Sequence, residues 1–127
     1  MTSDPLFGEP ISVYGREQML ADGQLSDIDT WDPAAPGGSI AREAGYRHKV
    51  YVTAGVHALA TRAVNRYFND FAGVAWDLLH MAKPAIARLR TDGPSTTPFR
   101  LVIAPKTVDL RLGFDGEAFT IMLPEED

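Results

Sequence analysis

The last third of this 127-residue sequence alternates hydrophobic and polar residues, and this pattern constrains the fold most strongly. Three runs, at residues 99–103, 110–114 and 119–123, place hydrophobic side chains at every second position. A period of two is typical of strands with one buried face. Asp115-Gly116, between the second and third runs, is a strong β-hairpin signal. The sequence therefore predicts three antiparallel strands in chain order, whose hydrophobic face needs a helical cover.

The middle of the sequence supplies that cover. Thr53 is a favourable N-cap, and hydrophobic residues follow at positions 56, 59, 60, 63 and 64, the spacing of a helix with one buried face. A second helical pattern begins at residue 69 or 70. Pro84 either kinks this helix or opens a further one. The two helices are expected to pack on the sheet.

Residues 39–65 hold several structural signals close together. Ser39 is expected to cap a short helix over residues 40–44, and Gly45 to end it. Residues 49–52 have the β-branched and aromatic content of a strand.

An earlier short helix is expected over residues 15–23. Gly15 is an acceptable N-cap for it, and Gly23 stands where a C-cap glycine is wanted.

These signals predict an α+β fold: a C-terminal three-stranded antiparallel meander packed against central helices, with the short N-terminal helix at the edge. The length predicts a single domain over residues 1–127. Residues 1–10, with two prolines and a glycine, are expected to form an extended leader. Residues 30–38 contain two prolines and two adjacent glycines, which indicates a loop.

Composition excludes several classes of protein. No cysteine is present, which excludes disulfides, thiolate catalysis and thiolate metal sites. The net charge of −5 disfavours a general affinity for nucleic acid, which needs a clustered basic face. The N-terminal residues lack the basic and hydrophobic regions of a signal peptide, and no hydrophobic run approaches the length of a membrane span. We therefore expect a protein of the cytoplasm with no membrane contact.

The residues suited to catalysis or metal binding do not form a recognisable motif. A metal site would need two pairs of ligands with suitable spacing. The three histidines, His48, His57 and His80, do not provide them. A GxSxG serine motif is also absent, since Gly37-Gly38-Ser39 leads into a helix. We expect no metal, no cofactor and no catalytic residues, and hence a protein that is not an enzyme.

Three kinds of binding site remain open. The helix start at Gly37–Arg42 could hold a phosphate group on its backbone amides. The basic stretch from Arg42 to Tyr51 could contact nucleic acid, although its charge is small for that role. Exposed aromatic residues would instead favour a protein partner. The candidate binding residues are Trp31, Arg42, Tyr46, Arg47 and His57.

Trp31 has two interpretations of its own. Its ring either folds back over the edge of the core or is exposed as a contact residue.

Three blocks of the sequence, ISVYGREQMLADGQLSDI, AREAGYRHKVYVTAGVHAL and IMLPEED, resemble a family of small bacterial proteins carried by plasmids and phages. That family is catalogued as a domain of unknown function. Its pattern has a hydroxyl residue where Gly15 stands and a tryptophan where His57 stands, and residues 30–38 look like an insertion.

The resemblance implies an origin on a mobile element. It leads us to expect a non-enzymatic accessory protein that acts in the host cytoplasm. Such a protein would bind a host protein or protein complex, for example as an inhibitor of a defence system such as an anti-CRISPR. The alternative is a small enzyme or a nucleotide- or phosphate-binding protein that uses the Gly37–Arg42 helix start.

Overall fold

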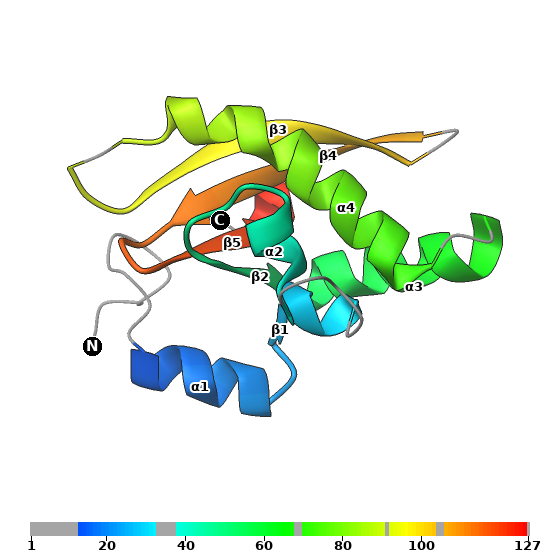
Figure 1. The fold of residues 1–127 in the computed structure, drawn as a ribbon, viewed down its shortest axis with the longest axis horizontal. Coiled ribbons are helices and arrows are strands. Elements are labelled where there is room, and N and C mark those ends of the chain that lie inside the picture. Colours follow the sequence, from blue (N-terminus) through cyan, green and yellow to red (C-terminus); the bar gives the residue numbers. More distant parts are fainter. Residues whose placement is uncertain (1–12, 33–37, 68–69, 91, 104–105, 127) are drawn as a thin grey trace.

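The computed structural model describes residues 13–32, 38–67, 70–90, 92–103 and 106–126. These residues form an α+β fold with four α-helices and a five-stranded mixed sheet (Figure 1). The α-helices are α1 (Val13–Ala21), α2 (Ile40–Glu43), α3 (Ala54–Tyr67) and α4 (Phe71–Ala82). The strands are β1 (Leu25–Asp27), β2 (Lys49–Thr53), β3 (Ser95–Ile103), β4 (Lys106–Phe114) and β5 (Ala118–Met122). Short 3-10 helices are η1 (Ile28–Trp31), η3 (Lys83–Arg88) and η4 (Pro124–Glu126).

Two predicted segments fall wholly or partly outside the described residues. They are the leader over residues 1–10 and residues 33–37 of the insertion. The first residues of the predicted insertion belong to η1.

The sheet has the strand order β1-β2-β5-β4-β3. Neighbouring strands are antiparallel except β2 and β5, which are parallel. β3, β4 and β5 lie side by side in chain order and are antiparallel, and the sheet extends beyond these three strands because β5 also pairs with β2. Val50 and Val52 of β2 lie beside Phe119 and Ile121 of β5, and all four side chains are buried. A parallel pair joins distant segments and has no turn between its strands, so no local signal marks it.

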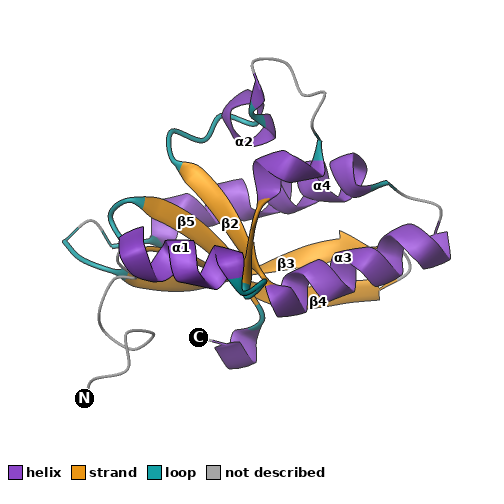
Figure 2. Ribbon diagram, turned by 90° about the horizontal axis from the view of Figure 1, so that it is seen from below, coloured by secondary structure: helices purple, strands orange, loops and turns teal. Residues whose placement is uncertain are grey.

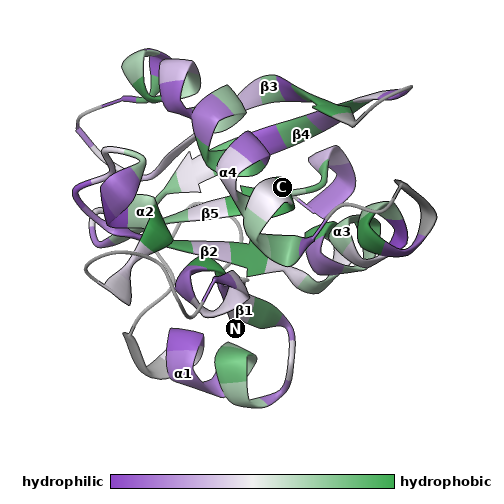
Figure 3. Ribbon diagram, turned by 45° about the vertical axis from the view of Figure 1, so that its right-hand side comes forward, coloured by the Kyte–Doolittle hydropathy of each residue, from purple (hydrophilic) through white to green (hydrophobic). Residues whose placement is uncertain are grey.

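The core lies between one face of the sheet and the helices. Its completely buried side chains come from β2, β3, β4 and β5, from the facing sides of α2, α3 and α4, and from Ile28 of η1. Figure 2 shows α2 and α4 on one side of the sheet, and Figure 3 shows hydrophobic residues gathered in β2 beneath the helices. α1 lies beside β1 at the edge of the sheet, as Figure 1 shows.

Helix ends follow the predicted capping residues in most places. Ser39 Oγ accepts a hydrogen bond from the Arg42 N–H at 3.1 Å, and Asp70 Oδ1 accepts one from the Gly73 N–H at 2.7 Å. α1 is an exception, because it begins at Val13 and places Gly15 inside the helix. Its C-terminus agrees with the sequence: Gly23 has a φ of 76°, which a glycine adopts without strain.

For Pro84, the structure has the second of the two predicted alternatives. After α4 the chain tightens into η3, with Pro84 near its start, so the proline opens a further helix of the 3-10 type. β3 begins at Ser95, and Pro98 lies inside this edge strand. An edge strand tolerates proline because the missing N–H faces away from the sheet. The outward carbonyl of Pro98 accepts a hydrogen bond from Arg88.

None of the helices in the described part of the chain is long and hydrophobic enough to cross a membrane.

Candidate functional site

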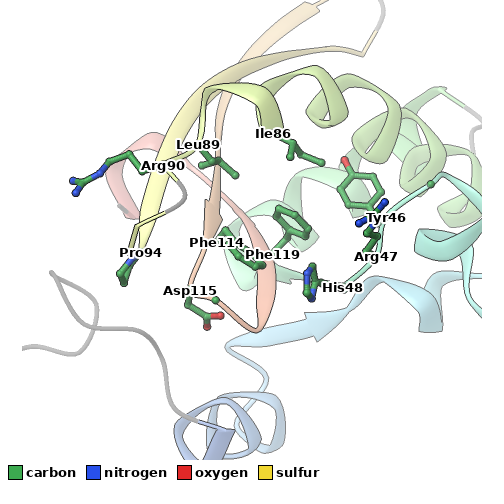
Figure 4. Close-up of a pocket in the computed structure, with 13 residues that line it drawn as sticks. Tyr46, Arg47, His48, Ile86, Leu89, Arg90, Pro94, Phe114, Asp115 and Phe119 are labelled. Atoms are coloured by element: carbon green, nitrogen blue, oxygen red, sulfur yellow. The ribbon is translucent and has the colours of Figure 1, made fainter.

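A pocket of about 490 Å³ opens at one end of the sheet, under η3 (Figure 4). Three segments that are far apart in the sequence form its walls. These are the turn before β2, the end of η3 with the residues that lead from it into β3, and the β4–β5 hairpin. A volume of this size is typical of sites that hold a small molecule or a side-chain anchor.

The turn before β2 directs Tyr46 into the core beside this pocket. Gly45 ends α2 with a φ of 97°, and the N–H of Tyr46 donates to the carbonyl of Ala41 at 3.0 Å. This is a Schellman ending, in which the residue after the glycine packs back on the helix. The Tyr46 hydroxyl donates to the carbonyl of Leu79 at 2.6 Å, and burial raises the pKa of Tyr46. Tyr46 is therefore a neutral structural side chain and not a general base.

Aromatic rings form the inner wall of the pocket. Phe114 and Phe119 pack with ring centroids 4.7 Å apart. Tyr46 meets Phe119 edge-on at 5.5 Å, and His48 lies 5.1 Å from Phe114. Ile86 and Leu89 form the opposite wall, which is aliphatic. Their side chains face the rings (Figure 4). The interior is therefore suited to a hydrophobic group.

The rim of the pocket is cationic. Arg47 and Arg90 line the pocket, and both are exposed. The exposed His48 also lines it. One acidic residue, Asp115, also lines it, but its carboxylate is paired with the Arg16 guanidinium from α1. Arg90 forms an ion pair with Asp92 in which both side chains are about 70% exposed. An exposed pair of this kind stabilises little, so Arg90 can exchange its partner at small cost.

Trp31 and His57 lie elsewhere in the molecule, in a second aromatic cluster with Phe71. The Trp31 ring meets both other rings edge-on at 5.5 Å, and His57 stacks on Phe71 at 5.5 Å. Trp31 is only 7% exposed, and its indole N–H donates to Ser26 Oγ at 3.1 Å. Of its two interpretations, the structure has the ring folded against the core.

The five sequence candidates therefore separate into different places. Tyr46 and Arg47 line the pocket, whereas Trp31 and His57 form the second cluster. Arg42 is exposed on α2 and does not line the pocket.

The start of α2, which the sequence offers as a phosphate site, holds a carboxylate of the chain itself. Asp29 Oδ1 accepts hydrogen bonds from Ser39 Oγ at 3.0 Å and from the Ala41 N–H at 3.1 Å. Lys49 Nζ lies 2.8 Å from the other oxygen. Without the Asp29 carboxylate, these groups would be available to bind an external anion. A phosphate ligand would have to displace Asp29, which makes this helix start a poor anion site.

The same contacts control the ionisation of Asp29. Burial raises the pKa of this carboxyl, but hydrogen bonds from Lys49, Ala41 and Ser39 outweigh it and hold the pKa below its usual value. The carboxylate thus stabilises the fold fully above about pH 4, the usual value for an unfolded chain. This stabilisation is lost as the pH falls through the lowered pKa of the folded state.

Asp29→Asn is expected to lower the free energy of unfolding by about 2 kcal/mol at pH 7, because charged hydrogen bonds are lost. Its stability should also fall less steeply than that of the wild type below about pH 4. Urea denaturation at a series of pH values measures both effects. Asp77→Asn, at an exposed position of α4, is the control. An unchanged pH profile in Asp29→Asn would contradict the assignment.

The two tyrosines that would stack on nucleic-acid bases are not free to do so. Tyr46 is buried, and the ring of Tyr51 is covered by the Arg16 guanidinium at 5.3 Å from its centroid. Lys49 pairs with Asp27 at 2.6 Å as well as with Asp29. Within the described residues, no group of three acidic or histidine side chains is placed to hold a metal ion.

Most of the pocket-lining residues were not among the sequence candidates. The missed residues include Ile86, Leu89, Arg90, Phe114, Asp115 and Phe119. Two signals were nevertheless present. The Asp115-Gly116 hairpin marked the strand ends that carry the two phenylalanines, and Pro84 marked the segment that carries Leu89 and Arg90.

Comparison with protein-family models, with curated proteins and with solved structures finds no match to this chain.

Proposed function

We propose that this chain is a non-enzymatic protein-binding module of a phage or plasmid, which acts in the host cytoplasm on a host protein or protein complex. An inhibitor of a defence system, such as an anti-CRISPR, is the role that we favour. The three sequence blocks that resemble a plasmid- and phage-borne family support the mobile-element origin. The pocket under η3 supports the binding role.

The observation that carries the proposal is a hydrophobic pocket with a cationic rim and no catalytic arrangement on its walls. The titratable groups that line it either have a hydrogen-bond or ion-pair partner within the protein or lie at the rim. Tyr46 donates to Leu79 O, and Asp115 pairs with Arg16. A pocket that buries one anchor side chain, next to exposed arginine, is typical of a protein contact.

A photo-crosslinking residue in place of Arg47 tests this proposal inside the bacterial host. We expect it to capture one defined protein, whereas the same residue in place of the exposed Arg62 of α3 captures none. Gly93 provides a blocking variant, since it lines the pocket and a Cβ there would meet no atom within 4 Å. Gly93→Leu adds a side chain at the pocket wall, which should obstruct the anchor and abolish the capture.

The defence role has its own readout. A host that expresses the chain should lose CRISPR interference in a plasmid-transformation assay, and Gly93→Leu should restore it. The proposal fails if position 47 captures no protein while the purified chain turns over a small molecule.

A further inference from the structure

We infer that the pocket under η3 recognises an aromatic or aliphatic side chain flanked by acidic residues in an extended segment of the partner protein. This inference rests on the proposed function and specifies the chemistry of the partner.

The interior selects a hydrophobic ring or branched chain. Phe114 and Phe119 offer ring faces and edges, and Leu89 closes the other side. An aromatic anchor would gain edge-to-face contacts with these rings beyond the burial of its surface. His48 stands against Phe114 at 5.1 Å on the solvent side, so an inserted ring can contact it too. The pocket is open on one side, which lets the anchor arrive on a continuous chain.

The rim selects the residues beside the anchor. Arg47 comes from the turn before β2 and Arg90 from the segment after η3, so the two cations flank the pocket from different walls. The whole protein has a net charge of −5, which would repel an acidic partner elsewhere on its surface. Asp115 is paired with Arg16, and Arg90 is paired with Asp92 through an exposed ion pair that an acidic partner can replace at small cost. A segment with one acidic residue on either side of the anchor therefore matches the rim in charge.

Three synthetic peptides test the inference without knowledge of the partner. They are acetyl-Glu-Phe-Glu-amide, acetyl-Gln-Phe-Gln-amide and acetyl-Lys-Phe-Lys-amide, titrated into the isotopically labelled chain and followed by amide NMR shifts. We expect the acidic peptide to bind about fivefold more tightly than the neutral one at low ionic strength, as two exposed ion pairs allow. The difference should shrink at about 0.5 M salt. The amide signals of Gly45, Gly93 and Gly116, which line the pocket, should shift when a peptide binds.

Variants separate the rim from the interior. Arg47→Gln and Arg90→Gln should each remove part of the preference for the acidic peptide and weaken binding of the acidic peptide more than that of the neutral peptide. Gly93→Leu should abolish binding of all three peptides. Arg62→Gln, at an exposed site outside the pocket, should change nothing.

Several outcomes would overturn the inference. Equal affinity for the acidic and neutral peptides would remove the charge selection. Free acetyl-phenylalanine binding as tightly as the acidic peptide would indicate a small-molecule site instead. A dimer of this chain that Gly93→Leu dissolves would mean that a second copy occupies the pocket. Capture of a host protein at position 47 is measured without the peptides, so the proposed function is judged separately.

Discussion

Trp31→Ala is expected to lower the free energy of unfolding by about 3–5 kcal/mol, the usual cost of removing a buried aromatic ring. The side chain is 7% exposed and packs edge-on against His57 and Phe71. Its removal also leaves Ser26 without the indole donor 3.1 Å away. Urea denaturation followed by circular dichroism measures the change.

The two tryptophans of the chain form a natural comparison. Trp76 is half-buried on α4 and stacks on His80 at 4.9 Å, so Trp76→Ala should cost only about 1–2 kcal/mol. Trp31→Phe keeps most of the ring contacts and should fall between wild type and Trp31→Ala. If Trp31→Ala were within about 0.5 kcal/mol of wild type but lost its partner, Trp31 would be the exposed contact residue that the sequence also allowed.

Arg16→Met is expected to lower the free energy of unfolding by about 3 kcal/mol, because it breaks a largely buried ion pair. Arg16 is 7% exposed and pairs with Asp115 and, at 3.3 Å, with Glu117. Its guanidinium also lies over the ring of Tyr51 at 5.3 Å. Without Arg16, the carboxylate of Asp115 would stay in a site only 13% exposed with its charge unbalanced. Urea denaturation at pH 7 tests this prediction.

A double-mutant cycle with Asp115→Asn isolates the pair. An asparagine oxygen can still accept the N–H groups of Glu117 and Ala118, which donate to Asp115 at 2.9 Å. The double variant should therefore be more stable than the sum of the single changes predicts, by about 1–2 kcal/mol. The exposed pair Arg100–Asp109 should show less than about 0.5 kcal/mol in the same cycle. Strict additivity at Arg16 and Asp115 would disprove the buried pair.

The Arg16 pair also connects α1 with the pocket. Asp115 is both the partner of Arg16 and part of the pocket wall, so α1 and the β4–β5 hairpin are held together at this point. A loss of peptide affinity in Arg16→Met would follow from movement of that hairpin.

Local signals in the sequence predicted much of the secondary structure. The β4–β5 hairpin forms around Asp115 and Gly116, where the turn places Gly116 at a φ of 96°. Ser39 and Gly45 bound α2 because a hydroxyl satisfies a free N–H at one end and a glycine adopts the left-handed turn at the other. Such signals depend on the few residues around each position, so the sequence displays them directly.

The candidate site could be predicted only in part. Tyr46 and Arg47 were candidates because they belong to the basic stretch from Arg42 to Tyr51. Phe119 and Leu89 looked like ordinary core residues, since nothing in a hydrophobic pattern shows which side chain borders a cavity. The burial of Trp31 was open for a similar reason: a tryptophan near prolines and glycines can face either way until its neighbours on α3 and α4 are known.

The amino-acid sequence by itself determined the α+β class, the ends of most helices and the β4–β5 hairpin, because each depends on periodicity or capping over a few residues. The tertiary structure alone decided that β2 pairs in parallel with β5, that Asp29 occupies the start of α2, and that Arg16 neutralises Asp115. These contacts join segments far apart in the chain, and only the packing of the whole core selects among such partners. The pocket under η3 forms where three segments that are distant in the sequence meet.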